Sequence, residues 1–100
     1  MRKIHLTNYS FGNQTFEVGP SIGVILFNEP KLDSREVIRR DELANKIESC
    51  KEEYILLEEV EWSKIVSSLQ STDLKPLGRS VVEFLKRILD APQIEVQEKS

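Results

Sequence analysis

Cysteine and histidine are almost absent from this chain of 100 residues, which contains one of each, Cys50 and His5. A single cysteine excludes an intrachain disulfide, and it either is typical of a protein that works in a reducing cytoplasm or leaves one thiol for intermolecular chemistry. A zinc site needs about four nitrogen or sulfur ligands, so two such side chains exclude one. A cysteine–histidine nucleophile pair would require the two residues to meet in space, which nothing in their spacing indicates. We therefore expect neither a metal nor a cofactor.

Glycine and long apolar runs are also scarce. The four glycines, at positions 12, 19, 23 and 78, are scattered, and none begins the strand-to-helix turn that cradles a phosphate. No apolar run approaches the roughly 18–20 residues of a membrane helix. The N-terminal stretch MRKIHLTNYSFG lacks the apolar core of a signal peptide. We expect a single cytoplasmic domain that has no contact with a membrane.

The charge balance is acidic, with a formal net charge of −3. This balance argues against nucleic acid as the partner, because phosphate binding is driven by clustered lysine and arginine. Two basic pairs remain, Arg39-Arg40 and Lys86-Arg87, each on a candidate helix. Asp41 and Glu42 follow the first pair at once, which favours local ion pairs. Binding to nucleic acid remains the alternative function, and it would require the four basic residues to converge on one face.

Acidic residues gather in the middle of the chain, and they offer a different alternative. They are Glu52, Glu53, Glu58, Glu59 and Glu61. The alternating pattern of a calcium loop is missing. A carboxylate pair among them would be the acid and base of an enzyme, but no matched nucleophile, base and oxyanion set accompanies them. Their position at a helix start indicates favourable dipole placement instead. We expect a protein that is not an enzyme.

Strand patterns dominate the N-terminal region. Ile4 and Leu6 share one face of a first arm, Phe16 and Val18 share one face of a second, and Gly12-Asn13 can close the loop between them. Gly19-Pro20 then ends the second arm. The run Ser21–Phe27 is either a third strand, over Ile22–Phe27, or a short buried helix, because its periodicity does not decide. Tyr54–Leu57 has the same ambiguity, as a fully buried strand or the lead-in to a helix.

Three amphipathic helices are predicted, over Ser34–Cys50, Glu58–Gln70 and Ser80–Ala91. The first begins at Asp33 or Ser34 as N-cap, and Asp41 interrupts its apolar face, so a bend is expected near Arg40. The last carries an apolar stripe of Val81, Val82, Leu85, Ile88 and Leu89. Residues 92–100 follow as a tail in which Ile94 and Val96 alternate with polar residues, as an edge strand or a mobile end. The fold class is α+β, an N-terminal β-hairpin of two or three strands covered by about three helices.

Apolar surface is more plentiful than such a small domain can readily cover. An exposed apolar patch usually marks an interface, and symmetric dimers are the commonest way to bury one. We therefore expect a protein-interaction or assembly protein that acts as a homo-oligomer or through a protein partner. The candidate interface residues lie on two helical stripes: Trp62, Ile65, Val66 and Leu69, and Val81, Leu85 and Ile88. The alternative is that the two stripes pack on each other within one monomer.

The order of segments adds a family resemblance. LTNYSFGNQTFEV comes first, RRDELANKIESCKEEYILLEEVEWSKI lies in the middle and EFLKRILDAP stands near the end. This order resembles small uncharacterised proteins encoded by tailed phages and prophages, and the likeness runs over most of the chain. The resemblance implies a small accessory or assembly protein in a bacterial cytoplasm that acts through protein contacts. It assigns no role to any residue.

Overall fold

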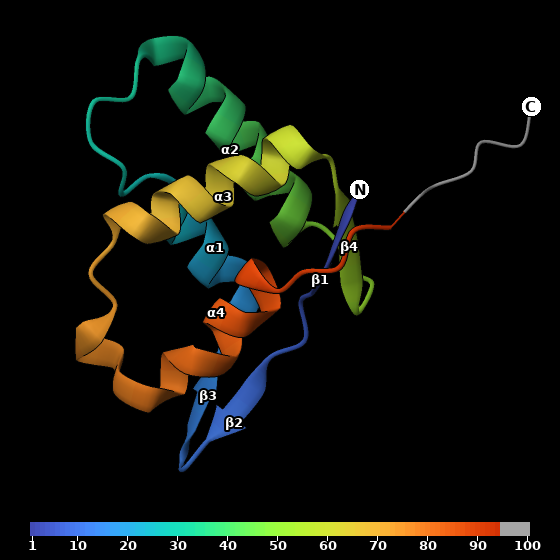
Figure 1. Ribbon diagram of the computed structural model, residues 1–100, viewed down its shortest axis with the longest axis vertical. Helices are drawn as coiled ribbons and strands as arrows, with labels where there is room; N and C mark the ends of the chain where they lie inside the picture. Colours follow the sequence, from blue (N-terminus) through green and yellow to red (C-terminus); the bar gives the residue numbers. More distant parts are fainter. Residues whose placement is uncertain (95–100) are drawn as a thin grey trace, which may run out of the picture.

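Residues 1–94 are described by the computed structural model, apart from the side chains of residues 75 and 77, and they form the expected α+β fold (Figure 1). The strands are β1 (Arg2–His5), β2 (Tyr9–Phe11), β3 (Gln14–Phe16) and β4 (Tyr54–Leu57). The helices are α1 (Val18–Leu26), α2 (Ser34–Glu48), α3 (Glu59–Ser71), the 3-10 helix η1 (Lys75–Val81) and α4 (Val82–Leu89). Helices α1, α2 and α3 pack together, and the β2–β3 hairpin projects beside α4 (Figure 1).

The strands pair differently from the predicted hairpin. β1 lies antiparallel to β4, with Ile4 opposite Ile55, and a separate short hairpin joins β2 to β3. The prediction that the arm of Ile4 pairs with the arm of Phe16 was therefore wrong, although the region does contain a hairpin. Ile4 is fully buried, and β4 offers it an alternating apolar face for the core. Gly12 closes the hairpin with φ 62°, as the first position of a type II′ turn requires.

β4 settles one of the two ambiguous runs as a strand, and it is buried on one face only. Ile55 and Leu57 are buried, whereas Tyr54 is 42% exposed and carries Lys3 Nζ 4.3 Å from its ring centroid. The other edge of β1 receives the end of the described chain through an antiparallel bridge between Arg2 and Gln93. Gln93 thus takes the edge position expected for the tail, while Val96 lies outside the described residues.

α1 settles the other ambiguous run as a helix, so the third strand proposed over Ile22–Phe27 does not form. Gly19 and Pro20 do not end a strand either, because they lie in the first turn of α1. A proline is tolerated there, since its missing N–H would have no helical partner at that position. Ile22 and Leu26 are completely buried one turn apart, which gives α1 a face against α2 and α3.

The three predicted helices are present, with altered ends. Asp33 caps α2 by accepting a hydrogen bond from Glu36 N at 2.8 Å. The helix then runs without interruption to Glu48, so the bend expected near Arg40 is absent. α3 differs from its prediction by one residue at each end. α4 begins later than predicted, at Val82, because η1 occupies the preceding residues and is kinked at Gly78, where φ is 60°.

The apolar stripe of α4 was partly misassigned. Phe84, which the predicted stripe omitted, is 1% exposed, whereas Val82 and Leu89 are 44% and 49% exposed. Starting the helix at Val82 and packing it on the β2–β3 hairpin turns Phe84 toward Phe16, whose ring centroid lies 5.1 Å away. Phe84 therefore joins the core and forms one end of the groove described below.

Tyr9 joins the hairpin to α4. Its hydroxyl donates to Ser80 O and accepts from Phe84 N at 3.1 Å, so it satisfies one of the first free N–H groups of the helix. Its ring stacks on Phe16 with 5.1 Å between centroids, and the Arg87 guanidinium lies over the Tyr9 ring at 5.1 Å from its centroid. Burial raises the pKa of Tyr9, so the phenol keeps the proton that it donates.

Candidate functional site

The predicted interface stripes lie largely inside the monomer. The fully or almost fully buried members are Ile65, Leu69, Val81 and Ile88. The partly buried members, packed against the core, are Trp62, Val66 and Leu85. In this fold the two stripes pack against the same core. The four buried side chains are therefore not available for contact with a second molecule.

Trp62 links α3 to neighbouring segments at the edge of the core. Its indole Nε1 donates to Ile88 O at 2.8 Å, and the Arg2 guanidinium lies 4.1 Å from its ring centroid. Arg2 also bonds Glu59 Oε1 at 2.8 Å and Ala91 O at 2.9 Å. These contacts tie β1 and the end of α4 to α3.

The four predicted basic-patch residues are not gathered on one face. Arg39 and Lys86 are exposed, on α2 and α4, which lie on either side of the α1 and α3 helices (Figure 1). Arg40 is 5% exposed. Arg87 donates to Thr7 O and pairs with Glu83 at 3.2 Å. Two of the four cations are thus held by partners within the domain.

Arg40 is the centre of a buried charge network. Its guanidinium contacts Glu29 Oε2 at 2.5 Å and Glu36 Oε1 at 3.1 Å. It also donates to Leu26 O at 3.0 Å and to Ser68 Oγ at 2.5 Å. These partners come from α1, the loop after it, α2 and α3, so one side chain joins all three helices. This contact set explains why an arginine occupies the buried face of α2, since its charge and its donors are satisfied there.

The carboxylates of this network are stabilised in their charged form. A hydrogen bond from Ser67 and the contact with Arg40 hold the pKa of Glu29 below its ordinary value of 4.5. A hydrogen bond from Lys64, at 2.6 Å, together with Arg40, lowers the pKa of Glu36 in the same way. Both shifts mean that folding favours the deprotonated carboxylates.

We expect acid to destabilise the fold through this pair. Because both folded pKa values lie below the unfolded ones, their stabilisation is complete above the unfolded value of 4.5 and is lost as the pH falls through the folded values. The loss of folding free energy is measured by urea unfolding between about pH 6 and pH 3, which spans the range in which carboxylates titrate. The variant Glu29→Gln/Glu36→Gln should show a shallower pH dependence than the wild type. The control Glu52→Gln, at an exposed residue, should keep the wild-type slope.

Two of the central glutamates are held in ion pairs within the domain. Glu59 pairs with Arg2 at 2.8 Å, Glu61 pairs with Lys46 at 3.1 Å, and Glu61 Oε1 also accepts from Glu58 N at 3.0 Å. Among residues 1–94, no group of three or more histidine, cysteine, aspartate or glutamate side chains is placed to hold a metal ion. Glu59 and Glu61 therefore serve ion pairs and the start of α3, whereas Glu52 and Glu53 line a separate pocket of about 250 Å³ beside Glu48 and Cys50.

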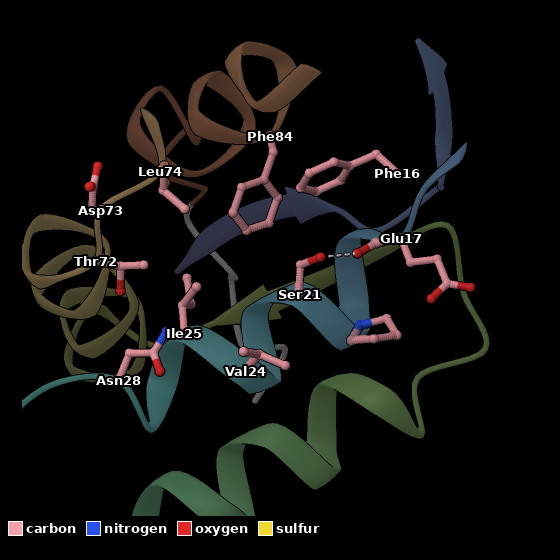
Figure 2. Close-up of a pocket in the computed structure, with 11 residues that line it drawn as sticks. Phe16, Glu17, Ser21, Val24, Ile25, Asn28, Thr72, Asp73, Leu74 and Phe84 are labelled. Atoms are coloured by element: carbon pink, nitrogen blue, oxygen red, sulfur yellow. Dashed lines mark hydrogen bonds between the residues drawn. The ribbon is translucent and has the colours of Figure 1, made fainter. Parts of the chain in front are cut away.

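A groove of about 440 Å³ lies between α1 and the segment that follows α3. Its long wall is α1, with Pro20, Ser21, Val24 and Ile25, and Asn28 just beyond it. Thr72, Asp73 and Leu74 form the facing wall, and Phe84 of α4 and Phe16 of β3 close one end (Figure 2). This volume lies in the range of small-ligand and side-chain pockets, roughly 300–1,000 Å³.

The interior of the groove is apolar, and its charges lie at the ends. Ser21 Oγ donates to Glu17 O at 2.5 Å, and Thr72 Oγ1 donates to Ser68 O at 2.8 Å. Both hydroxyl protons are therefore engaged with backbone carbonyl groups of the same chain segment. Figure 2 shows Leu74, Ile25 and Phe84 around the centre, with the carboxylates of Glu17 and Asp73 at opposite ends and turned away from it. Val24 of α1 is 63% exposed at the edge. The groove is suited to an apolar side chain.

Sequence reasoning missed this groove because its lining comes from four separate segments. Phe16 and Val24 were noted as parts of apolar runs, but Thr72, Leu74 and Phe84 had no pattern that linked them to α1. The exposed Val24, between buried apolar residues of α1, is the signal for the groove, and it becomes visible only once α1 is known to be a helix.

Comparisons with protein-family models, with curated proteins and with solved structures gave no match. Within residues 1–94, no helix has both the length and the apolar character required to cross a membrane.

Proposed function

We propose that this protein is a non-enzymatic interaction protein that binds a protein partner by taking an apolar side chain into the groove beside α1. The observation that carries the proposal is the groove itself, an apolar trough of about 440 Å³ with the 63%-exposed Val24 at its edge. Solvent-exposed apolar grooves are the usual receptors for the anchoring side chains of partners. Such a role agrees with the small accessory or assembly protein, acting in the bacterial cytoplasm, that the phage and prophage resemblance implies.

The groove also replaces the interface first expected from the sequence. Trp62 and the buried members of its stripe are occupied within the domain, so self-association through them has no structural support. A second copy of the chain remains a possible partner for the groove. Nucleic acid is the weaker alternative, because Arg40 and Arg87 are held by internal partners.

The test uses peptides selected from a random linear library against the wild-type protein. We expect Val24→Glu to weaken binding of the selected peptides by at least tenfold, about 1.4 kcal/mol or more, because a carboxylate at the edge would desolvate beside the apolar anchor. Isothermal calorimetry of each peptide against each variant provides the measurement.

Val60→Glu is the matched control. Val60 is 66% exposed on α3 and does not line the groove, so its substitution should leave every affinity unchanged. If the two substitutions weakened peptide binding equally, or if neither changed it, the binding surface would lie elsewhere. Light scattering on the peptide-free protein at high concentration shows whether a second copy fills the same groove, since Val24→Glu would then shift a dimer toward monomer.

A further inference from the structure

We infer that the partner segment is an extended, positively charged strand that pairs with the open edge of β3 while its apolar side chain enters the groove. This inference deepens the proposed function and rests on it. Three features support it: the free backbone groups of Thr15, the continuity of two cavities and the sign of the charge along them.

The first observation is an unused pair of backbone groups on β3. The two-residue turn at Gly12-Asn13 makes the flanking pair Phe11 and Gln14 the hydrogen-bonded one, so the next pair, Ser10 and Thr15, is not bonded across the hairpin. The N–H and C=O groups of Thr15 therefore point away from β2. Among residues 1–94, no other group bonds to either of them. An exposed strand edge of this kind is a template for an added strand.

The second observation is that this edge leads into the groove. A second cavity of about 280 Å³ is lined by Phe11, Gln14 and Thr15 at one end. At its other end it shares Phe16, Glu17 and Ser21 with the groove beside α1. In a strand, residues i and i+2 point to the same face. A strand laid along β3 would thus direct one side chain into this second cavity and the next one on the same face into the groove.

The third observation is charge. Glu17 lines both cavities and Asp73 lines the groove, and the described side chains that line them include no lysine or arginine. Glu17 is exposed at the point where the two cavities meet. Complementary charge raises the rate of association and selects partners. The occupant that fits is a partner segment in which one large apolar residue lies between lysine or arginine residues.

The pairing is tested with the peptides selected from the library. Each is resynthesised with single N-methyl groups along its backbone, which remove one donor at a time without altering the side chains. We expect binding to fall about tenfold at the one position whose N–H bonds Thr15 O, the loss of roughly one backbone hydrogen bond, and to change little at the others. Hydrogen exchange of the Thr15 amide should slow when peptide is added, while the Ser10 amide, on the opposite edge of the same hairpin, should exchange as before.

The charge is tested in the same system. The selected sequences should be enriched in lysine and arginine beside one apolar position, and Glu17→Gln should weaken their binding severalfold at low salt. Glu42→Gln, an exposed carboxylate on α2 away from both cavities, should have no effect.

The outcomes separate this inference from the proposed function. Peptides that require Val24 but tolerate every N-methyl group and leave Thr15 exchange unchanged would overturn the strand pairing and keep the groove as a binding site. Peptides without basic residues, or insensitive to Glu17→Gln, would overturn the charged partner. If the Thr15 amide exchanged more slowly when the protein concentration was raised without peptide, the occupant would be a second copy of the chain. That result would overturn the inference of a different, basic partner. Peptides that do not depend on Val24 would overturn both conclusions.

Discussion

Arg40→Ala is expected to lower the free energy of unfolding by about 3–5 kcal/mol, the usual effect of removing one partner of a buried ion pair. The substitution leaves Glu29 and Glu36 without the guanidinium that contacts them at 2.5 and 3.1 Å. It also leaves Leu26 O and Ser68 Oγ without a donor. Small domains have a total stability of about 5–15 kcal/mol, so the loss would remove a large share of it. Urea unfolding followed by circular dichroism measures the change.

Arg39→Ala is the matched control, because the neighbouring side chain is 64% exposed and approaches Glu36 only to 3.9 Å. Its effect should stay within about 0.5 kcal/mol, as for most surface substitutions. Similar losses for the two variants would mean that Arg40 acts as an ordinary surface cation. Such a result would contradict the buried network that joins the three helices.

Ile65→Ala is expected to cost about 2–5 kcal/mol of folding stability, the range for deleting a fully buried isoleucine side chain. Ile65 is completely buried on α3, in the core shared with α1 and α4. The sequence had suggested this residue as part of a subunit interface, so the variant separates a core role from an interface role. Thermal and urea unfolding of the protein measure the change in stability.

Val60→Ala on the same helix gives the baseline. Val60 is 66% exposed, so its truncation should change stability by no more than about 0.5 kcal/mol. If Ile65→Ala left unfolding unchanged but weakened an oligomer, the stripe would face a partner and the packing of α3 described above would be wrong.

The long helices were predictable because their signals are local. Asp33 caps α2 where the sequence placed an N-cap, and the apolar period over Trp62–Leu69 defined α3 to within one residue at each end. Capping residues and periodicity are read within one or two turns, so they do not depend on the rest of the fold. The α+β class followed from these helices and from the alternating N-terminal segments.

The strand pairing was not predictable, since it joins segments that are distant in the chain. β1 pairs with β4 because both place an isoleucine toward the common core, and the apolar pattern of β1 alone does not identify its partner. The short helix α1 was ambiguous because its run is almost wholly apolar, and Pro20 suggested a break although it lies in a first turn.

The site was less predictable still. A buried arginine such as Arg40 has the same sequence signature as an exposed one, and only the arrival of Glu29 and Ser68 from other segments makes it a core residue. The groove has the same origin, because Phe16, Val24 and Leu74 become neighbours through packing.

The central claim is that the groove beside α1 is the binding surface, and a methyl-resolved NMR titration tests it most directly. The probe is a peptide from the library selection, added to protein labelled at valine, leucine and isoleucine methyl groups. We predict that the methyl signals of Val24, Ile25 and Leu74 shift and saturate together, while those of Val60 on α3 stay in place. Saturating shifts at Val60 with no change at Val24 would contradict the account, because the partner would then bind on a face that the groove does not reach.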